Sequence, residues 1–184
     1  RFFHQAALAG DPRLEDFFSE EYALNHLIHG YAKPYIAWMD GICMGGGIGM
    51  SVHGPYRVAT EHAGFGMPET AIGFFPDIGA TFLLPRLRGH LGAYLGLTGL
   101  RLTGADAVHA GLATHFVPRV RLPALSAALA KDGPSVLADF AETLPPFSLA
   151  DHLDAIERCF TAETVPDIIA HLEREDADWA KAAL

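Results

Sequence analysis

The amino-acid sequence predicts an α/β fold followed by a helical region, and three observations support this prediction. A β-like run at residues 34–39 leads into three consecutive glycines at 45–47, and an apolar-periodic segment follows them. This order is typical of a strand, a tight turn and a helix. Residues 56–60 alternate as a further strand does. Beyond Pro118 every periodic segment has helical spacing.

The first expected helix covers residues 14–29. Gly30, directly after it, suits the left-handed position that ends many helices. The apolar side chains of this segment fall near the 3.6-residue spacing of one helix face. They are Phe17, Phe18, Leu24, Leu27 and Ile28.

The region around the glycines is expected to form a strand, a turn and a short helix. Lys33-Pro34 begins the strand, which runs to Met39, and the helix covers residues 46–52. The run His53-Gly-Pro55 ends that helix, because proline cannot continue one.

Strands and helices are also expected further along the chain. Residues 64–67 predict a short strand, whereas residues 68–85 are so rich in glycine and proline that they predict a loop with short helical turns. Helical spacing returns at residues 90–97 and 104–110, and Thr103 is a good N-cap for the second of these helices.

The last expected strand covers residues 113–117, and the chain beyond it is expected to be all helical. We therefore divide the chain into an α/β part, residues 1–118, and a helical C-terminal region, residues 119–184. The helices expected in that region cover residues 122–131, 135–142, 149–160, 165–175 and the terminal segment.

The composition excludes several classes of protein. With 184 residues and 50% hydrophobic content, the chain can form one substantial core. Its net charge of −9 argues against nucleic acid as the main partner. The two cysteines and ten histidines show no disulfide framework and no metal-ligand spacing, so we expect no metal. No apolar run has membrane-spanning length and no secretory signal is visible, which predicts a soluble intracellular protein.

The glycine turn is the first candidate for a functional site. Its bare backbone can approach a ligand, and the N–H groups at the start of the following helix can bind an oxyanion or a phosphate. A close-packed turn without a ligand explains the glycines equally well. The dinucleotide motif Gly-x-Gly-x-x-Gly fails at Met50, no Lys-Ser or Lys-Thr pair follows the glycines, and the hydrolase motif Gly-x-Ser-x-Gly is absent.

Two carboxylates follow the turn in apolar surroundings that are rich in glycine and proline. Glu69, after Pro68, suits the first turn of a helix, and Asp77 is a common turn residue, so each has an ordinary structural explanation. Together, near an oxyanion-binding turn, they predict an acid/base pair of an enzyme that acts on an activated carbonyl. The residues alone leave Glu21 solvated on its helix and His53 as a cap or surface group.

A family resemblance rests on six segments. They are Lys33-Pro-Tyr-Ile-Ala, Gly41-Ile-Cys-Met-Gly-Gly-Gly-Ile-Gly-Met, Tyr56-Arg-Val-Ala-Thr, Phe65-Gly-Met-Pro-Glu, Leu97-Thr-Gly and Ala105-Asp-Ala-Val-His-Ala-Gly-Leu-Ala. These segments look like the crotonase (enoyl-CoA hydratase/isomerase) superfamily. Within it, Met67-Pro-Glu-Thr-Ala-Ile-Gly-Phe-Phe-Pro-Asp-Ile-Gly79 is similar to the 3-hydroxyisobutyryl-CoA hydrolases. The resemblance covers nearly the whole chain.

The resemblance implies a crotonase-like spiral of ββα units with a helical C-terminal region. By resemblance, the Gly46 N–H is an oxyanion-hole donor, Glu69 is the catalytic glutamate, Asp77 completes the hydrolase site and Glu21 contacts the substrate. The implied reaction is hydrolysis of a short β-hydroxyacyl-CoA thioester, 3-hydroxyisobutyryl-CoA of valine breakdown above all. No separate cofactor is implied, because CoA is part of the substrate. A homo-oligomer, either a trimer or a hexamer, is the expected assembly.

Two departures from the family pattern matter. Hydratases of the superfamily carry a first catalytic glutamate two residues after the glycine triplet, where this chain has Gly49. A hydratase or isomerase that uses Glu69 alone stays an alternative, and a non-catalytic acyl-CoA-binding subunit is another. The loop that supplies the family's second oxyanion N–H is not found before Arg1, so we expect that the N-terminal part of the spiral is missing.

A composition rich in alanine and arginine but poor in lysine favours the bacterial cytoplasm over the mitochondrial matrix.

Overall fold

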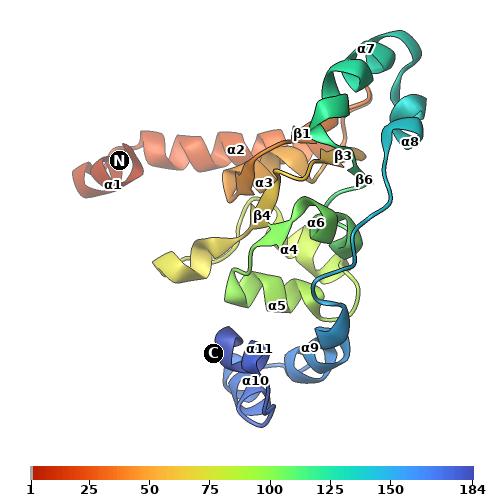
Figure 1. Cartoon of the computed structure of the whole chain (residues 1–184). Helices are drawn as coiled ribbons and strands as arrows, with labels where there is room; N and C mark the ends of the chain where they lie inside the picture. Colours follow the sequence, from red (N-terminus) through yellow and green to blue (C-terminus); the bar gives the residue numbers. More distant parts are fainter. Residues whose placement is uncertain (1) are drawn as a thin grey trace.

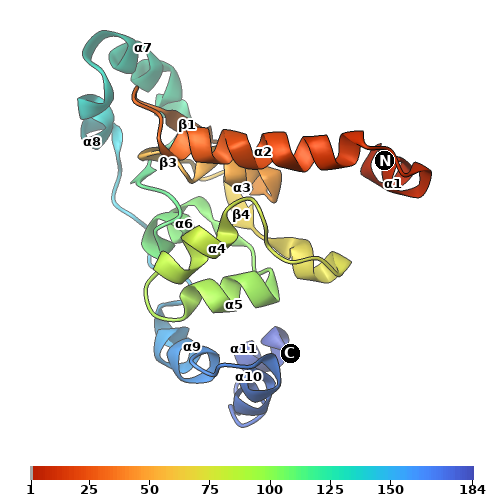
Figure 2. The ribbon, with the colours of Figure 1, turned by 180° about the vertical axis from the view of Figure 1, so that it is seen from behind.

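The computed structural model describes residues 2–184, so Arg1, with which the expected fragment begins, lies outside the described residues. Figure 1 shows a body of short strands and helices from which a helical arm projects. The arm consists of α1 (Phe2–Ala9) and α2 (Arg13–His29). The view from behind shows the same arm, which projects from the upper part of the body, whereas the C-terminal helices lie at its lower end (Figure 2).

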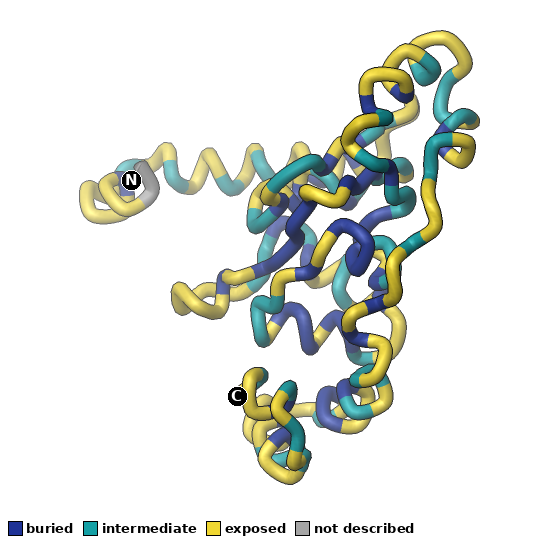
Figure 3. Tube along the Cα trace, viewed as in Figure 1, coloured by how far each residue is buried: buried dark blue, intermediate teal, exposed yellow. Residues whose placement is uncertain are grey.

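Helix α2 confirms the helix expected over residues 14–29, and Gly30 follows it as predicted. Gly30 has a φ of −95°, however, so the left-handed conformation expected there is not adopted. Where α2 joins the body it packs against α3 (Gly46–Ser51), and Ile28 is buried there. Further out along the arm, most of the surface of α2 is exposed (Figure 3). The exposed apolar side chains of this helix include Phe17, Leu24 and Leu27. The apolar spacing therefore predicted the helix correctly, but the apolar face that such spacing usually indicates is largely exposed here.

The strands form two small sheets of three strands each. The first has the order β1 (Ile36–Met39), β3 (Tyr56–Ala59), β6 (His115–Phe116), and the second β2 (Ile42–Met44), β4 (Gly64–Gly66), β5 (Leu102–Thr103). All pairs are parallel except β4 with β5. Four of the strands confirm expected ones in shortened form. Strands β2 and β5 were not expected, because strands of two or three residues are defined by their partners rather than by a local pattern.

Helical turns fill the segment between β4 and β5, as predicted for residues 68–85. They are η1 (Pro68–Ile72), α4 (Ala80–Leu83) and η2 (Leu84–Arg86), and they are followed by α5 (Leu91–Thr98). Helix α6 (Gly104–Ala110) has the expected bounds. Its N-cap Thr103 forms a capping box with Asp106, in which each side chain accepts a hydrogen bond from the other residue's backbone N–H.

The chain beyond β6 is helical, as expected. Its helices are η3 (Arg119–Arg121), α7 (Leu122–Asp132), η4 (Pro134–Val136), α8 (Leu137–Phe140), η5 (Ala150–His152), α9 (Leu153–Phe160), α10 (Val165–Leu172) and α11 (Asp178–Ala183). Two expected helices are each divided into a 3₁₀ turn and an α-helix. Within residues 2–184, no helix is both long and apolar enough to cross a membrane.

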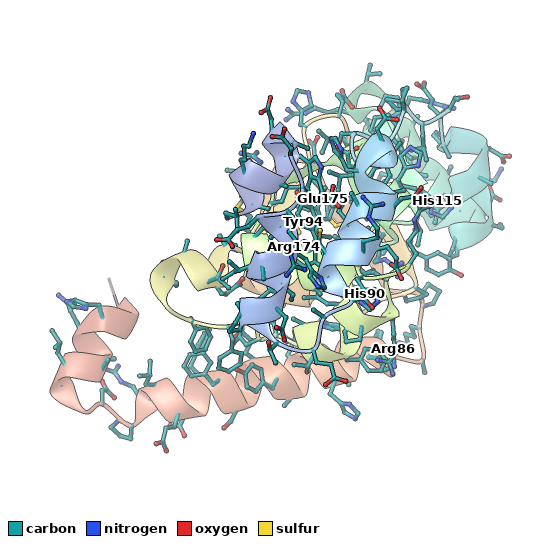
Figure 4. All side chains as sticks on the ribbon, turned by 90° about the horizontal axis from the view of Figure 1, so that it is seen from below. Arg86, His90, Tyr94, His115, Arg174 and Glu175 are labelled. Carbon is teal, nitrogen blue, oxygen red and sulfur yellow. The ribbon has the colours of Figure 1, made fainter. Side chains whose placement is uncertain are left out.

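The C-terminal helices pack on two different parts of the body. Helices α7 and α8 share a small core with Val58 of β3, whereas α9–α11 join the main core beneath α5. The Tyr94 ring of α5 contacts Phe160 and Trp179 edge-on, at centroid distances of 5.2 and 6.3 Å. In the view from below, Tyr94 lies within the area that these helices cover (Figure 4). The domain boundary near Pro118 stays a prediction.

Candidate active site

The glycine turn connects β2 to α3 and brings its backbone close to two glutamates. Gly45 has a φ of 51°, a conformation that favours glycine. A β-carbon on Gly45 would lie 3.4 Å from Glu69 Oε1, and one on Gly46 would lie 2.9 Å from Glu21 Oε1. Because Gly46 is the first residue of α3, the helix itself cannot satisfy its N–H. The turn thus presents a backbone donor beside both carboxylates.

Glu69 is the most deeply buried of the site's acidic residues. It lies in the first turn of η1 after Pro68, and only 7% of its surface is exposed. Its Oε2 atom has no hydrogen-bond partner within the described residues. Burial raises the pKa of the Glu69 carboxyl; its own backbone N–H opposes this rise, and the charge of Asp77 adds to it. A buried carboxylate with a raised pKa is a stronger base than an exposed one.

Glu21 is part of the site rather than of the solvated helix surface. It lies half-buried on the side of α2 that faces the glycine turn, whereas its neighbour Glu20 is exposed. Burial raises the pKa of Glu21, and the charge of Asp77 raises it further. The expectation of a solvated Glu21, which rested on the residues alone, is therefore wrong, because helix periodicity does not tell which face meets α3.

Asp77 is held by a tyrosine that the sequence analysis did not identify. The Tyr22 hydroxyl donates a hydrogen bond to Asp77 Oδ2 at 2.8 Å, across 55 residues of sequence. Burial raises the pKa of Tyr22 to about 12, and the hydrogen bond to Asp77 and that residue's charge contribute to the rise. A single sequence holds no signal for this pair, since the two residues meet only through the packing of α2.

The backbone after Asp77 is also fixed. Ile78 has a φ of 44°, which is rare for a β-branched residue, and only 3% of its surface is exposed. His53 Nε2 donates to the Ile78 carbonyl at 2.7 Å. A β-carbon on Gly79 would lie 2.6 Å from His53 Cε1, so the ring packs closely over this glycine. His53 is thus half-buried and fastens the Asp77 segment, which corrects its expected role as a cap or surface group.

A cavity of about 580 Å³ adjoins Asp77. Apolar side chains such as Phe75 and Phe82 form much of its wall, and Tyr22 and Asn25 add polar groups from α2. Asn25 is buried, and neither polar atom of its amide has a hydrogen-bond partner in the described part of the chain. Both atoms lie 3.1–3.2 Å from the position of a β-carbon on Gly49.

The site is rich in carboxylates. The structure brings together Gly46, Glu21, Glu69 and Asp77, the four residues that the sequence analysis selected. No ion pair among residues 2–184 involves any of the three carboxylates. In the same range no group of three His, Cys, Asp or Glu side chains could hold a metal ion. Two carboxyls with raised pKa values, beside an N–H that α3 itself cannot satisfy, suit proton transfer next to a developing oxyanion.

The family is established by comparison with known proteins. The family model described as enoyl-CoA hydratase/isomerase matches residues 1–184. The crystal structure of an enoyl-CoA hydratase from Rhodobacter sphaeroides matches 98% of this chain and 53% of that chain, with a TM-score of 0.91 and 40% identity. The chain therefore belongs to the enoyl-CoA hydratase/isomerase, or crotonase, family, and its crotonase-like fold is confirmed.

Two relatives with different names are similar to the chain. One is the mitochondrial 3-hydroxyisobutyryl-CoA hydrolase of Xenopus tropicalis, 48% identical over 95% of this chain and 49% of that protein. The other is the small ribosomal subunit protein mS47 of Neurospora crassa, 45% identical over 92% of this chain and 37% of that protein. The chain thus spans half or less of the length of these relatives.

The predicted bacterial cytoplasmic location is wrong. The similar hydrolases from Xenopus, cattle and rat are named as mitochondrial proteins, which contradicts the prediction. The prediction failed because it rested on alanine, arginine and lysine content, and overall composition contains no sorting signal.

Proposed function

We propose that the protein hydrolyses a short β-hydroxyacyl-CoA thioester, and that the substrate is 3-hydroxyisobutyryl-CoA, which yields 3-hydroxyisobutyrate and CoA in valine breakdown. The named function of the Xenopus tropicalis relative supports this substrate. No separate cofactor takes part, because the CoA group belongs to the substrate.

In this proposal Glu69 activates the attacking group. As a general base it accepts a proton from water while the water oxygen attacks the thioester carbon, and the Gly46 N–H stabilises the oxyanion that forms. The tetrahedral intermediate then collapses, the carbon–sulfur bond breaks, and the CoA thiolate takes up the proton. Alternatively, the Glu69 carboxylate attacks the thioester carbon directly, the carbon–sulfur bond breaks and CoA leaves as a thiolate, which takes up a proton from water. The resulting anhydride is then hydrolysed by water, which releases the acid and restores Glu69. Asp77 orients the water or the substrate hydroxyl, and Glu21 contacts the substrate.

One observation supports hydrolysis most directly. Glu69 is buried beside the glycine turn, whereas the place of the hydratases' first glutamate is taken by Gly49. A β-carbon on Gly49 would lie 2.9 Å from the Ile78 β-carbon, so this position has no room for a second carboxylate. Addition of water to a double bond needs two carboxylates around one water, whereas thioester hydrolysis needs one base and an oxyanion donor.

The test compares two reactions of the full-length protein. Thiol release from 3-hydroxyisobutyryl-CoA is followed with a thiol reagent, and hydration of crotonyl-CoA is followed by loss of the enoyl absorbance. We expect thiol release without hydration. Hydration without thiol release would refute the hydrolase and favour the hydratase alternative, which the name of the Rhodobacter sphaeroides structure supports.

A non-catalytic role is the second candidate. It is supported by the Neurospora crassa relative, which is named as a ribosomal protein although it is 45% identical to this chain. Binding of an acyl-CoA without turnover of either substrate would favour this role. Self-association as a trimer or hexamer is proposed for either function, and light scattering of the full-length protein tests it.

A further inference from the structure

We propose that Tyr22 is a positioning residue of the active site, which fixes the orientation of the Asp77 carboxylate. The inference rests on the proposed function for its kinetic consequence, and on the geometry alone for the contact. Tyr22 directly follows Glu21 on α2. This helix therefore places the Glu21 carboxylate beside Gly46 and the adjacent Tyr22 hydroxyl beside Asp77.

The contact has the length of an ordinary hydrogen bond from a hydroxyl group, and 42% of the surface of Tyr22 is exposed. The Tyr22 hydroxyl lies 2.8 Å from Asp77 Oδ2, and a phenol that donates to a carboxylate forms a charge-assisted bond. The Tyr22 ring also contacts Phe18 of the same helix, at a centroid distance of 6.1 Å. With Oδ2 engaged by Tyr22, the rotation of the carboxylate is restricted, and Oδ1 can accept a hydrogen bond from water or a substrate hydroxyl.

The electrostatics keep Tyr22 in its donor form. A tyrosine hydroxyl is protonated at neutral pH even at its ordinary pKa of 10, and here the pKa is raised further, to about 12. Glu21 cannot replace it as a donor in the ionised state, because a carboxylate only accepts hydrogen bonds. Tyr22 therefore supplies a neutral O–H to Asp77 within an otherwise acidic site.

Asp77 also has a second, independent anchor on its backbone. The bond from His53 Nε2 to the Ile78 carbonyl holds the chain directly after Asp77. Loss of the phenol hydroxyl therefore leaves the segment in place and frees only the side chain. This arrangement predicts a loss of rate rather than a loss of folding when Tyr22 is changed.

The first test is kinetic and uses Tyr22→Phe in the full-length protein. We expect kcat for thioester hydrolysis to fall about tenfold with KM within about twofold of the wild type. Tyr35→Phe is the matched control, because the Tyr35 hydroxyl also donates a 2.8 Å hydrogen bond, to the Met50 carbonyl, without touching a carboxylate. In an Asp77→Asn background, Tyr22→Phe should change kcat less than twofold. Equal losses in the two tyrosine variants, or full additivity with Asp77→Asn, would overturn the inference.

The second test does not depend on turnover. Carbon-13 labelling of the tyrosine rings, with the Tyr22 signal assigned by its loss in Tyr22→Phe, reports the hydrogen bond at neutral pH. We expect this signal to move in Asp77→Asn and to stay in place in Asp139→Asn, a control on the exposed Asp139 of α8. A Tyr22 signal that is unchanged in Asp77→Asn overturns the inference. If the wild-type protein releases no thiol, the proposed function fails, and the labelling result still decides whether Tyr22 holds Asp77.

Discussion

Glu21 Oε1 lies 2.9 Å from the position that a β-carbon would occupy on Gly46. The closeness of these two residues explains why the first position of α3 carries no side chain. In the proposed function the start of α3 presents its N–H to the substrate, and the glutamate from α2 occupies the space that a side chain on Gly46 would need. A side chain on Gly46 would displace a carboxylate that belongs to the same site.

Gly46→Ala should therefore reduce activity more than stability. The added methyl meets the flexible end of Glu21, which can move away, so the fold tolerates the change while the site loses its arrangement. We expect kcat/KM for thioester hydrolysis to fall about 100-fold, as displacements near 1 Å do in other enzymes. Gly47→Ala is the matched control, because its β-carbon would lie an ordinary 3.9 Å from Cys43 Sγ. Comparable losses in the two variants would show that the start of α3 in general, and not Gly46, matters.

Glu69→Gln should abolish hydrolysis while acyl-CoA binding survives. The amide has nearly the same shape but can neither accept the proton nor attack the thioester, so we expect the rate to fall by a factor of about 1,000. Calorimetric titration with the substrate measures binding in the variant, and thiol release measures turnover. Retained turnover would remove Glu69 from the catalytic role.

The same substitution should change how stability depends on pH. Burial raises the pKa of Glu69 in the folded state, so between the ordinary value of 4.5 and the raised one the folded state binds more protons than the unfolded state. The stability associated with Glu69 is therefore complete below pH 4.5 and is lost as the pH rises through the raised pKa. Glu69→Gln removes this loss, so we expect the variant to be more stable than the wild type at pH 7 by about 1 kcal/mol.

Urea unfolding of both proteins between pH 4.5 and 7.5 measures this difference. The wild type and Glu69→Gln should converge toward the acidic end and separate as the pH rises. Glu20→Gln, on the exposed neighbour of Glu21, controls for loss of one negative charge and should show no such separation. A Glu69→Gln variant less stable than the wild type at pH 7 would mean that the carboxylate has a stabilising partner.

Features fixed by local interactions were predictable from the sequence. Helix α6 has its expected bounds because Thr103 and Asp106 satisfy each other's backbone N–H groups within one turn. The helix 14–29 was also predictable, since Gly30 marks its end. By contrast, β2 and β5 exist only through pairing with β4, a relationship that no local pattern contains.

The candidate site was predictable only where a motif described it. The glycine turn, Glu69 and Asp77 stand out in the sequence, and the family resemblance added Glu21. Tyr22 and His53 did not stand out, because their partners lie 55 and 25 residues away and meet them through packing. The upward shifts of the Glu21 and Glu69 pKa values likewise could not be predicted, because they depend on burial, and burial follows from the fold.

Gly49, which lies within α3 just after the glycine turn, should tolerate a side chain poorly. A β-carbon there would lie 2.9 Å from the Ile78 β-carbon and 3.1 Å from Asn25 Oδ1. Ile78 cannot give way easily, because its backbone is strained and its carbonyl is held by His53. We expect Gly49→Ala to lower the free energy of unfolding by about 1–3 kcal/mol, as overpacking of a core does. Gly41→Ala, whose β-carbon would have no neighbour within 4 Å, is the control.

Asn25→Ala tests which neighbour causes the strain expected in Gly49→Ala. Removing the amide gives the new methyl space on one side, so the double variant should be less destabilised than the sum of the two single changes. Urea midpoints of the four proteins measure this coupling. Gly49→Glu, which restores the residue of the hydratases, should be still less stable and should not hydrate crotonyl-CoA. A stable Gly49→Glu protein with hydratase activity would show that position 49 still faces the reacting atoms, and that the missing carboxylate alone separates the two reactions.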